Sequence, residues 1–146
     1  MSKKIILVSG GTGSIGECII DSLISENSII YFMYRSNEEK ACKIVEQYGK
    51  ENVKGFQCDI TDHEAVKQVV AEISKETDDT IDVLINTAGI IRDKTFLMMD
   101  DDDWHTVINV NLHGVYNVTR SVIFLMLKKK SGNIINVSSV SGIIGM

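Results

Sequence analysis

Short apolar runs alternate along this chain with segments whose hydrophobic residues recur every three or four positions. A short continuous apolar run predicts a strand buried on both faces, and the wider spacing predicts an amphipathic helix. The runs predict strands at 5–9, 28–34, 53–58, 81–86 and 133–138. The spaced segments predict helices at 14–26, 37–50 and 61–73, and a long one from about 101 to 129.

The regular alternation of strands and helices predicts an α/β fold in which the strands are parallel. Right-handed crossovers would place them in a Rossmann-type doubly wound sheet with the order 3-2-1-4-5. We find no internal boundary, linker or repeat beyond this alternation, so residues 1–146 are treated as one domain.

Local signals mark the ends of the predicted helices. Thr61 and Glu64 have the spacing of a capping box, and the cations at 128–130 followed by Gly132 suit a helix end. The four acids at 100–103 could hold a metal ion, but complementing the helix dipole explains them more simply, so no metal is predicted. One face of the long helix collects Trp104, Ile108, Asn111, Val115, Val118, Val122 and Leu125.

Charge and composition narrow the function classes. The formal net charge of -5 argues against a nucleic-acid-binding or anionic-membrane-binding surface. The apolar run at 5–8 is too short for a signal segment or a membrane span. Cys18, Cys42 and Cys58 fit no zinc spacing, so we expect structural thiols and a reducing cytoplasmic location.

A glycine-rich stretch, 9–16, lies between the first predicted strand and the first predicted helix. Glycines at such a junction allow a tight turn, and backbone N–H groups and the helix N-terminus attract a pyrophosphate. A plain glycine-rich turn is the alternative. The candidate cofactor-binding residues here are Gly10, Gly11, Thr12, Gly13, Ser14, Ile15 and Gly16.

This stretch resembles the Thr-Gly-x-x-x-Gly-x-Gly loop of short-chain dehydrogenases/reductases. Gly10 and Gly16 match, whereas Ser9 stands for the usual threonine and Ser14 for the middle glycine. The spacing of Gly10, Gly13 and Gly16 also fits the extended branch, which includes nucleotide-sugar epimerases and dehydratases. The loop alone therefore does not choose between the branches.

The end of the second predicted strand bears on the choice of cofactor. An acid there binds a ribose 2′-hydroxyl, whereas a cation accommodates a 2′-phosphate. Arg35 and Ser36 stand there with no acid before Glu38, so we expect NADPH/NADP; a solvated surface arginine is the alternative. By resemblance to the family, Asp59 would accept from the adenine amino group and Ile60 would pack near the ring, although Asp59 could simply begin a helix-entry turn.

Further motifs resemble the family in its catalytic part. Asn86-Thr-Ala-Gly89 resembles Asn-Asn-Ala-Gly, which implies that Asn86 binds the cofactor and braces the sheet, and that Ala88 and Gly89 leave room for the ribose near the nicotinamide. The stretches 89–99 and 104–117 resemble 3-oxoacyl-carrier-protein and acetoacetyl-CoA reductases in particular. The extended branch usually has neither stretch.

The resemblance also implies two catalytic residues. Asn111 matches the helix asparagine that holds a water in the proton relay, and Ser139 matches the serine that binds the substrate carbonyl. A satisfied core asparagine and a structural serine are the alternatives, and Ser138 or Ser141 could shift the serine assignment. An Asn on the buried helix face would require hydrogen-bond partners.

Taken together, the resemblance implies NADPH-dependent reduction of a 3-oxoacyl thioester, on acyl carrier protein or CoA, by a homotetrameric cytoplasmic parent enzyme. No Tyr-x-x-x-Lys follows Ser139, so we expect a C-terminally truncated chain that is inactive alone and marginally stable, with an unpaired edge at the fifth strand. The alternatives are a non-catalytic dinucleotide-binding or subunit-pairing fragment, and an extended-branch nucleotide-sugar epimerase or dehydratase.

Overall fold

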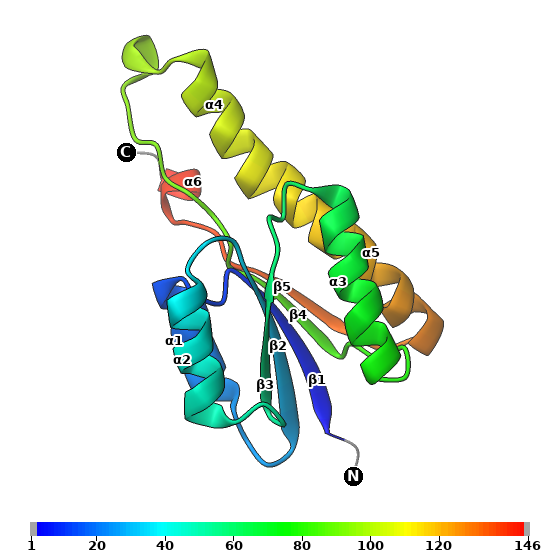
Figure 1. Ribbon diagram of the computed structural model, residues 1–146. Coiled ribbons are helices and arrows are strands. Elements are labelled where there is room, and N and C mark those ends of the chain that lie inside the picture. Colours follow the sequence, from blue (N-terminus) through cyan, green and yellow to red (C-terminus); the bar gives the residue numbers. More distant parts are fainter. Residues whose placement is uncertain (1–2, 145–146) are drawn as a thin grey trace.

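A five-stranded parallel sheet in the order β3-β2-β1-β4-β5 forms the centre of the computed structural model, which describes residues 3–144 (Figure 1). The predicted α/β class and strand order are confirmed. The predicted strands differ from the observed ones by no more than a couple of residues at either end. The strands are β1 (Lys4–Ser9), β2 (Ser28–Tyr34), β3 (Val53–Gln57), β4 (Val83–Asn86) and β5 (Asn133–Asn136).

Helices cover both faces of the sheet. The helical segments are α1 (Ser14–Leu23), α2 (Glu38–Tyr48), α3 (His63–Glu76), η1 (Phe96–Met98), α4 (Asp101–Ile108), η2 (Asn109–Gly114), α5 (Val115–Lys129) and α6 (Ser141–Ile144). Figure 1 shows α1 and α2 on one face, and α3 and α5 on the other. Within residues 3–144, no helix is both long enough and apolar enough to cross a bilayer.

The central strand β1 explains why its sequence is a continuous apolar run. Ile5 and Leu7 join the core cluster under α3 and α5, whereas Ile6 and Val8 join the cluster under α1 and α2. Because successive side chains of a strand point to opposite faces, a strand covered on both sides needs apolar residues at every position. The predicted two-sided burial is confirmed.

The long helix predicted over 101–129 is not an unbroken α-helix. A π-helical segment, η2, joins α4 to α5 while the backbone stays in the right-handed helical region. The wider π turn shifts the phase of the helix, so a single stripe spaced for an α-helix cannot stay buried through both parts. Val118 and Val122 are buried as predicted, but Trp104 and Asn111 are exposed.

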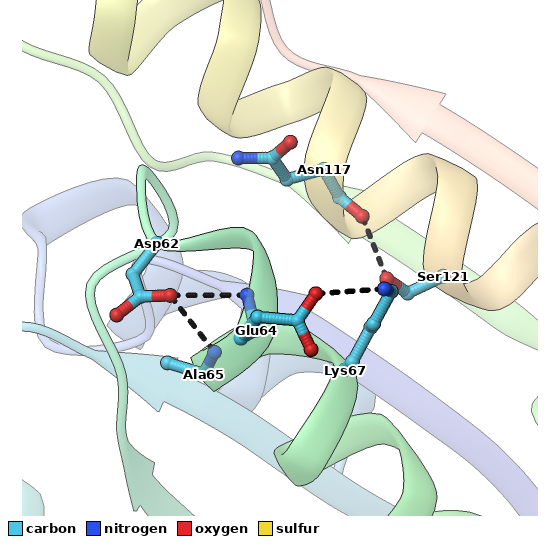
Figure 2. A network of polar contacts seen from close by, with 6 residues as sticks. All are labelled: Asp62, Glu64, Ala65, Lys67, Asn117 and Ser121. Atoms are coloured by element: carbon cyan, nitrogen blue, oxygen red, sulfur yellow. Dashed lines mark hydrogen bonds and ion pairs between the residues drawn. The ribbon is translucent and has the colours of Figure 1, made fainter.

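The N-cap residue predicted for the third helix was wrong. Asp62, not Thr61, is the N-cap, and its Oδ1 accepts from the N–H groups of Glu64 and Ala65, both at 3.0 Å (Figure 2). The Thr61 hydroxyl instead donates to Asp59. An aspartate one residue later supplies a charged acceptor at the helix N-terminus, which the dipole favours.

The end of α5 also differs from the prediction. Lys130, with φ 55°, is the left-handed C-cap, so the helix ends before Gly132. Gly132 is needed for packing instead, because a Cβ there would lie 2.5 Å from the Cγ of Met126. At the other end of this helical run, Asp100 caps α4 by accepting from the N–H of Asp103 at 2.8 Å.

The surface around β5 carries many exposed apolar side chains. Among residues 3–144, β5 pairs with β4 alone and forms one edge of the sheet, as expected. The exposed apolar residues of β5 and of the described segment that follows it are Ile135, Val137, Val140, Ile143 and Ile144.

Candidate functional site

A cavity of about 210 Å³ lies at the carboxyl ends of the central strands. The chain leaves β1 toward one face and β4 toward the other, and ligands of open α/β sheets bind at such a switch point. The cavity is smaller than the roughly 300–1,000 Å³ of typical small-molecule sites, because it is an open groove across the carboxyl ends of the strands. Of the predicted cofactor residues, the cavity is lined by Gly10, Thr12, Gly13, Arg35, Ser36, Asp59, Ile60, Ala88 and Gly89.

The glycine-rich turn is locked between β2 and the end of β4. The N–H groups of Gly10 and Gly11 both donate to the carbonyl of Met33 at 2.9 Å. Gly10 has φ 76°, and a Cβ there would lie 2.7 Å from the Cα of Ala88. Only glycine fits this left-handed position and close approach, so the turn brings its backbone to the cavity wall.

The turn leads into α1 through Gly13, the N-cap residue. The Gly13 N–H donates to the carbonyl of Gly10 at 2.9 Å, and helix geometry directs the next N–H groups, those of Ser14 and Ile15, out of the first turn. A Cβ on Gly13 would meet only the Gly10 oxygen, at 3.2 Å. Gly13 is therefore not required by the core, and its missing side chain keeps this end of the cavity open.

The predicted residues Gly11, Ser14, Ile15 and Gly16 do not line the cavity itself. Gly11 faces the ring of Phe32, where a Cβ would lie 2.6 Å from the side chain, and Gly16 is buried under the turn. These two glycines serve packing of the loop, whereas Ser14 and Ile15 contribute the exposed first turn of α1.

Arg35 and Ser36 form the rim of the cavity beyond the end of β2. The Nε2 of Gln57 donates to the Arg35 carbonyl at 3.1 Å, which fixes the backbone of this loop. Among residues 3–144, no carboxylate lies within ion-pair distance of the Arg35 guanidinium. Its charge is therefore open to an anionic ligand.

The loop after β3 forms another wall. The Oδ1 of Asp59 accepts from the N–H of Thr61 at 2.9 Å and from its hydroxyl at 2.8 Å, so the alternative role of Asp59 as a turn residue is present. Asp59 still lines the cavity beside Ile60 and Cys58. Burial, followed by the charges of Asp59 and Asp62, raises the pKa of the Cys58 thiol to about 11.

Asn86, at the end of β4, is turned into the sheet and does not line the cavity. Its Oδ1 accepts from Ser9 at 3.3 Å, and its Nδ2 donates to Thr119 at 3.2 Å and to Asn136 at 2.9 Å. The carboxamide thus joins β1, β4, β5 and α5. The cavity is instead lined by the next residue, Thr87, whose hydroxyl donates to the Ser9 carbonyl at 2.6 Å.

The two predicted catalytic residues lie outside the cavity lining. Asn111 is exposed rather than buried, yet its side chain makes two hydrogen bonds of 2.9 Å to the backbone of Ile90, which does line the cavity. Ser139 follows β5 and is exposed; its Oγ accepts from the N–H of Ser141 and donates to the Ser141 hydroxyl, both at 3.2 Å. Within residues 3–144, no group of acidic, His and Cys side chains is placed to hold a metal ion.

Sequence reasoning missed Thr87 and Asn117. Thr87 stands where the family motif has its second asparagine, and its hydroxyl helps to hold the turn by donating to the Ser9 carbonyl. Asn117 is buried on α5 and donates to the carbonyls of Ile60 and Thr61. The signal was present, because Asn117 lies between Gly114 and Val118 on the buried stripe of α5 once the helix is indexed from after the π turn.

A parallel sheet in this order, with a glycine-rich turn opening a helix at the switch point, defines a doubly wound fold of the Rossmann type. The family model described as short chain dehydrogenase matches residues 4–146, and the chain belongs to this family.

Several curated proteins are similar to almost the whole of this chain. The chain is 38% identical over 144 residues to the 3-oxoacyl-[acyl-carrier-protein] reductase FabG of Buchnera aphidicola, covering 99% of this chain and 58% of the relative. It is 36% identical to the same reductase of Vibrio harveyi, with 99% and 58% covered, and 37% identical to nodulation protein G of Azospirillum brasilense, with 99% and 59% covered. The chain thus spans a little under three fifths of the length of these curated relatives.

Solved structures agree on the fold. The structure titled "ElxO with NADP Bound" matches with a TM-score of 0.88 at 29% identity, over 99% of this chain and 58% of that one. Serine dehydrogenase from Escherichia coli matches with a TM-score of 0.86 at 29% identity, over 94% of this chain and 63% of the other.

Proposed function

We propose that this chain binds NADPH and forms the cofactor-binding part of a reductase that converts a 3-oxoacyl thioester, on acyl carrier protein or CoA, into the 3-hydroxyacyl thioester. The observation that carries the proposal is the cavity that joins the Gly10–Gly13 turn to Arg35 and to Ala88–Gly89. The similarity to FabG proteins supports the substrate class. The whole protein would be a cytoplasmic homotetramer, by the same family resemblance.

The turn fits a diphosphate. Gly13 leaves open the space that a side chain would fill, and the N–H groups of Ser14 and Ile15 point out of the first turn of α1. Backbone donors and the positive end of a helix dipole stabilise phosphate oxygens without any charged side chain. This end of the cavity would therefore hold the pyrophosphate of the cofactor.

The rim at Arg35 fits a 2′-phosphate on the adenosine ribose. A planar guanidinium binds phosphate through paired hydrogen bonds, and Ser36 adds a hydroxyl donor beside it. With no carboxylate paired to Arg35 among residues 3–144, the phosphate would not have to displace a partner. This arrangement favours NADPH over NADH.

The remaining walls would hold the two ends of the cofactor. Asp59 and Ile60 would contact the adenine, and Ala88 and Gly89 would leave room for the ribose near the nicotinamide. Asn111 would act on this region through Ile90, whose backbone it binds.

When bound, NADPH supplies the hydride that reduces the carbonyl carbon of the substrate. Ser139 would donate a hydrogen bond to the carbonyl oxygen and stabilise its developing charge. The proton for that oxygen would come from the tyrosine of a Tyr-x-x-x-Lys segment, which follows the serine in this family. The complete reaction is therefore proposed for the whole protein.

Titration of the chain with NADPH and with NADH, followed by nucleotide fluorescence or calorimetry, tests the proposal. NADPH should bind more tightly. Arg35→Ala should weaken NADPH by about 10–100-fold, as expected for a charge-assisted hydrogen bond, and leave NADH nearly unchanged. Arg120→Ala is the matched control, since Arg120 is an exposed arginine outside this cavity. Equal affinity of the chain for both nucleotides, or no binding of either, would overturn the proposal.

A further inference from the structure

The loop that follows β3 is held from the side by helix α5. The Nδ2 of Asn117 donates to the carbonyl of Ile60 at 2.9 Å and to the carbonyl of Thr61 at 3.3 Å. One turn earlier, a Cβ on Gly114 would lie 2.5 Å from the Cδ1 of Ile60, so the bare helix backbone lets that side chain pack closely. The loop is therefore fixed by a polar contact from α5 and by an apolar contact at Gly114, the last residue of η2.

These contacts reach a part of the loop that the sheet does not hold. Strand β3 ends at Gln57, the Cys58 N–H still donates to the Tyr34 carbonyl at 2.8 Å, and α3 then begins with the cap that Asp62 makes. Figure 2 shows Asn117 on α5 facing the region of this cap, with Ser121 one turn further along the same helix. Between these two anchors, Asn117 supplies the hydrogen bonds for the carbonyls of Ile60 and Thr61.

A carboxamide suits this task better than other side chains of similar size. Its two N–H donors can satisfy two neighbouring carbonyls, and Asn117 is only 8% exposed, so water cannot easily replace it. An alanine would leave the Ile60 carbonyl buried without a hydrogen-bond partner. Because an unsatisfied buried carbonyl is costly, we expect the loop to shift in this variant.

We propose that Asn117 is a positioning residue for the adenine end of the nucleotide. It acts through the Ile60 and Thr61 carbonyls, which set the wall formed by Asp59 and Ile60. The inference rests on the proposed function, because the wall matters for binding only if this cavity holds a dinucleotide.

Binding of the two halves of the cofactor separates this role from general damage to the fold. Asn117→Ala should weaken adenosine 2′,5′-bisphosphate about tenfold and leave reduced nicotinamide mononucleotide unchanged. Asn117→Gln keeps both N–H donors and should restore part of the lost affinity. Ser121→Ala is the matched control, since it removes only the hydrogen bond from Ser121 to the Asn117 carbonyl within α5.

Amide hydrogen exchange gives a second measurement that needs no nucleotide. The N–H of Thr61 donates to Asp59 Oδ1 and the N–H of Asp62 to the Asp59 carbonyl, so both report the shape of the loop. Asn117→Ala should speed exchange at Thr61 and Asp62, and Ser121→Ala should not. Unchanged exchange in Asn117→Ala would overturn the inference, and so would equal losses for both half-ligands.

The two proposals fail in different ways. If the unaltered chain bound neither NADPH nor the bisphosphate while loop exchange responded to Asn117→Ala, the NADPH proposal and the adenine role would be wrong and only the loop contact would stand. If the chain bound both ligands and Asn117→Ala bound them equally well, the NADPH proposal would stand and the positioning role would be wrong.

Discussion

The side chain of Asn111 pairs with the backbone of Ile90 as a neighbouring strand would. Its Oδ1 accepts from the Ile90 N–H and its Nδ2 donates to the Ile90 carbonyl, both at 2.9 Å. The segment around Ile90 has no regular secondary structure, so this pair replaces the ladder bonds that end with β4. The π-helical segment η2 carries Asn111 into this position.

Replacing Asn111 tests this pairing. Asn111→Ala should lower the free energy of unfolding by about 1–2 kcal/mol and speed amide exchange at Ile90, because both backbone groups lose their partner. Nucleotide affinity should fall as well, since Ile90 lines the cavity. Asn109→Ala in the same π segment is the control, because Asn109 is exposed and its side chain makes no hydrogen bond within residues 3–144. Equal behaviour of the two variants would contradict the assigned role.

The glycines of the turn should respond differently to a methyl group. Gly10→Ala places a side chain at φ 76° and 2.7 Å from the Cα of Ala88, which should cost about 2–4 kcal/mol of stability. Gly13→Ala meets only the Gly10 oxygen at 3.2 Å, so the fold should survive with a loss of less than about 1 kcal/mol. Chemical denaturation of both variants measures the difference.

Nucleotide binding gives the other half of this comparison. Gly13→Ala should weaken NADPH binding despite its intact fold, because the methyl group enters the space assigned to the pyrophosphate. A variant at Gly13 that folds and binds like the parent chain would show that the turn does not hold the phosphates.

Asp82 should make stability depend on acid pH. Burial raises the pKa of this carboxyl, but hydrogen bonds from the Lys129 ammonium and the Ile5 N–H outweigh it and leave the pKa below its ordinary value of 3.8. Because the folded-state pKa is lower than the unfolded one, the contribution is complete above the unfolded pKa. It is lost as the pH falls through the folded pKa.

We expect Asp82→Asn to be less stable by about 1–2 kcal/mol at neutral pH, and the difference should shrink as the pH falls below 3.8 and through the lowered pKa of Asp82. Denaturant midpoints measured between pH 7 and the acid limit check both statements. Asp93→Asn, at an exposed aspartate without an ion pair in residues 3–144, should change little at any pH. A constant difference for Asp82→Asn across the range would exclude the carboxylate as its cause.

The three thiols should differ in reactivity, although the sequence suggested one structural role for all of them. Cys18 and Cys42 are exposed, whereas Cys58 is buried and its pKa of about 11 keeps it protonated near neutrality. A thiol reagent at pH ~8 should therefore modify Cys18 and Cys42 quickly and Cys58 only after unfolding. The variant Cys18→Ala/Cys42→Ala isolates Cys58, and rapid modification of that variant in its folded state would contradict the burial.

The strands and their order could be predicted because short, mostly apolar runs alternate with segments of helical spacing. The central strands β1 and β2 are buried on both faces, whereas β5 is mostly exposed. The π turn could not be predicted, since its effect on the hydrophobic spacing of 101–129 depends on one local widening that periodicity cannot locate. The predicted start of α3 was one residue too early for a related reason. Thr61 and Asp62 are both good N-cap residues, and the path of the backbone decides which side chain reaches the free N–H groups.

The sequence could predict the site residues that are marked by a required backbone conformation or by their position at the end of a strand. Gly10 was found because its turn admits no other residue, and Arg35 because it follows a strand that ends at the cavity. Asn117 and Thr87 were missed because their roles are contacts with distant loops. A single sequence shows that such side chains are polar but not which carbonyls they meet.

The π segment can also be understood as a single-residue insertion. One residue fewer between Asn109 and Gly114 would restore a straight α-helix and turn every later side chain of α5 by about 100° around the axis. Val118 and Val122 would then leave the core, and Asn117 would lose the loop beneath it. The chain length of this stretch is therefore as strictly constrained as the identity of any residue in it.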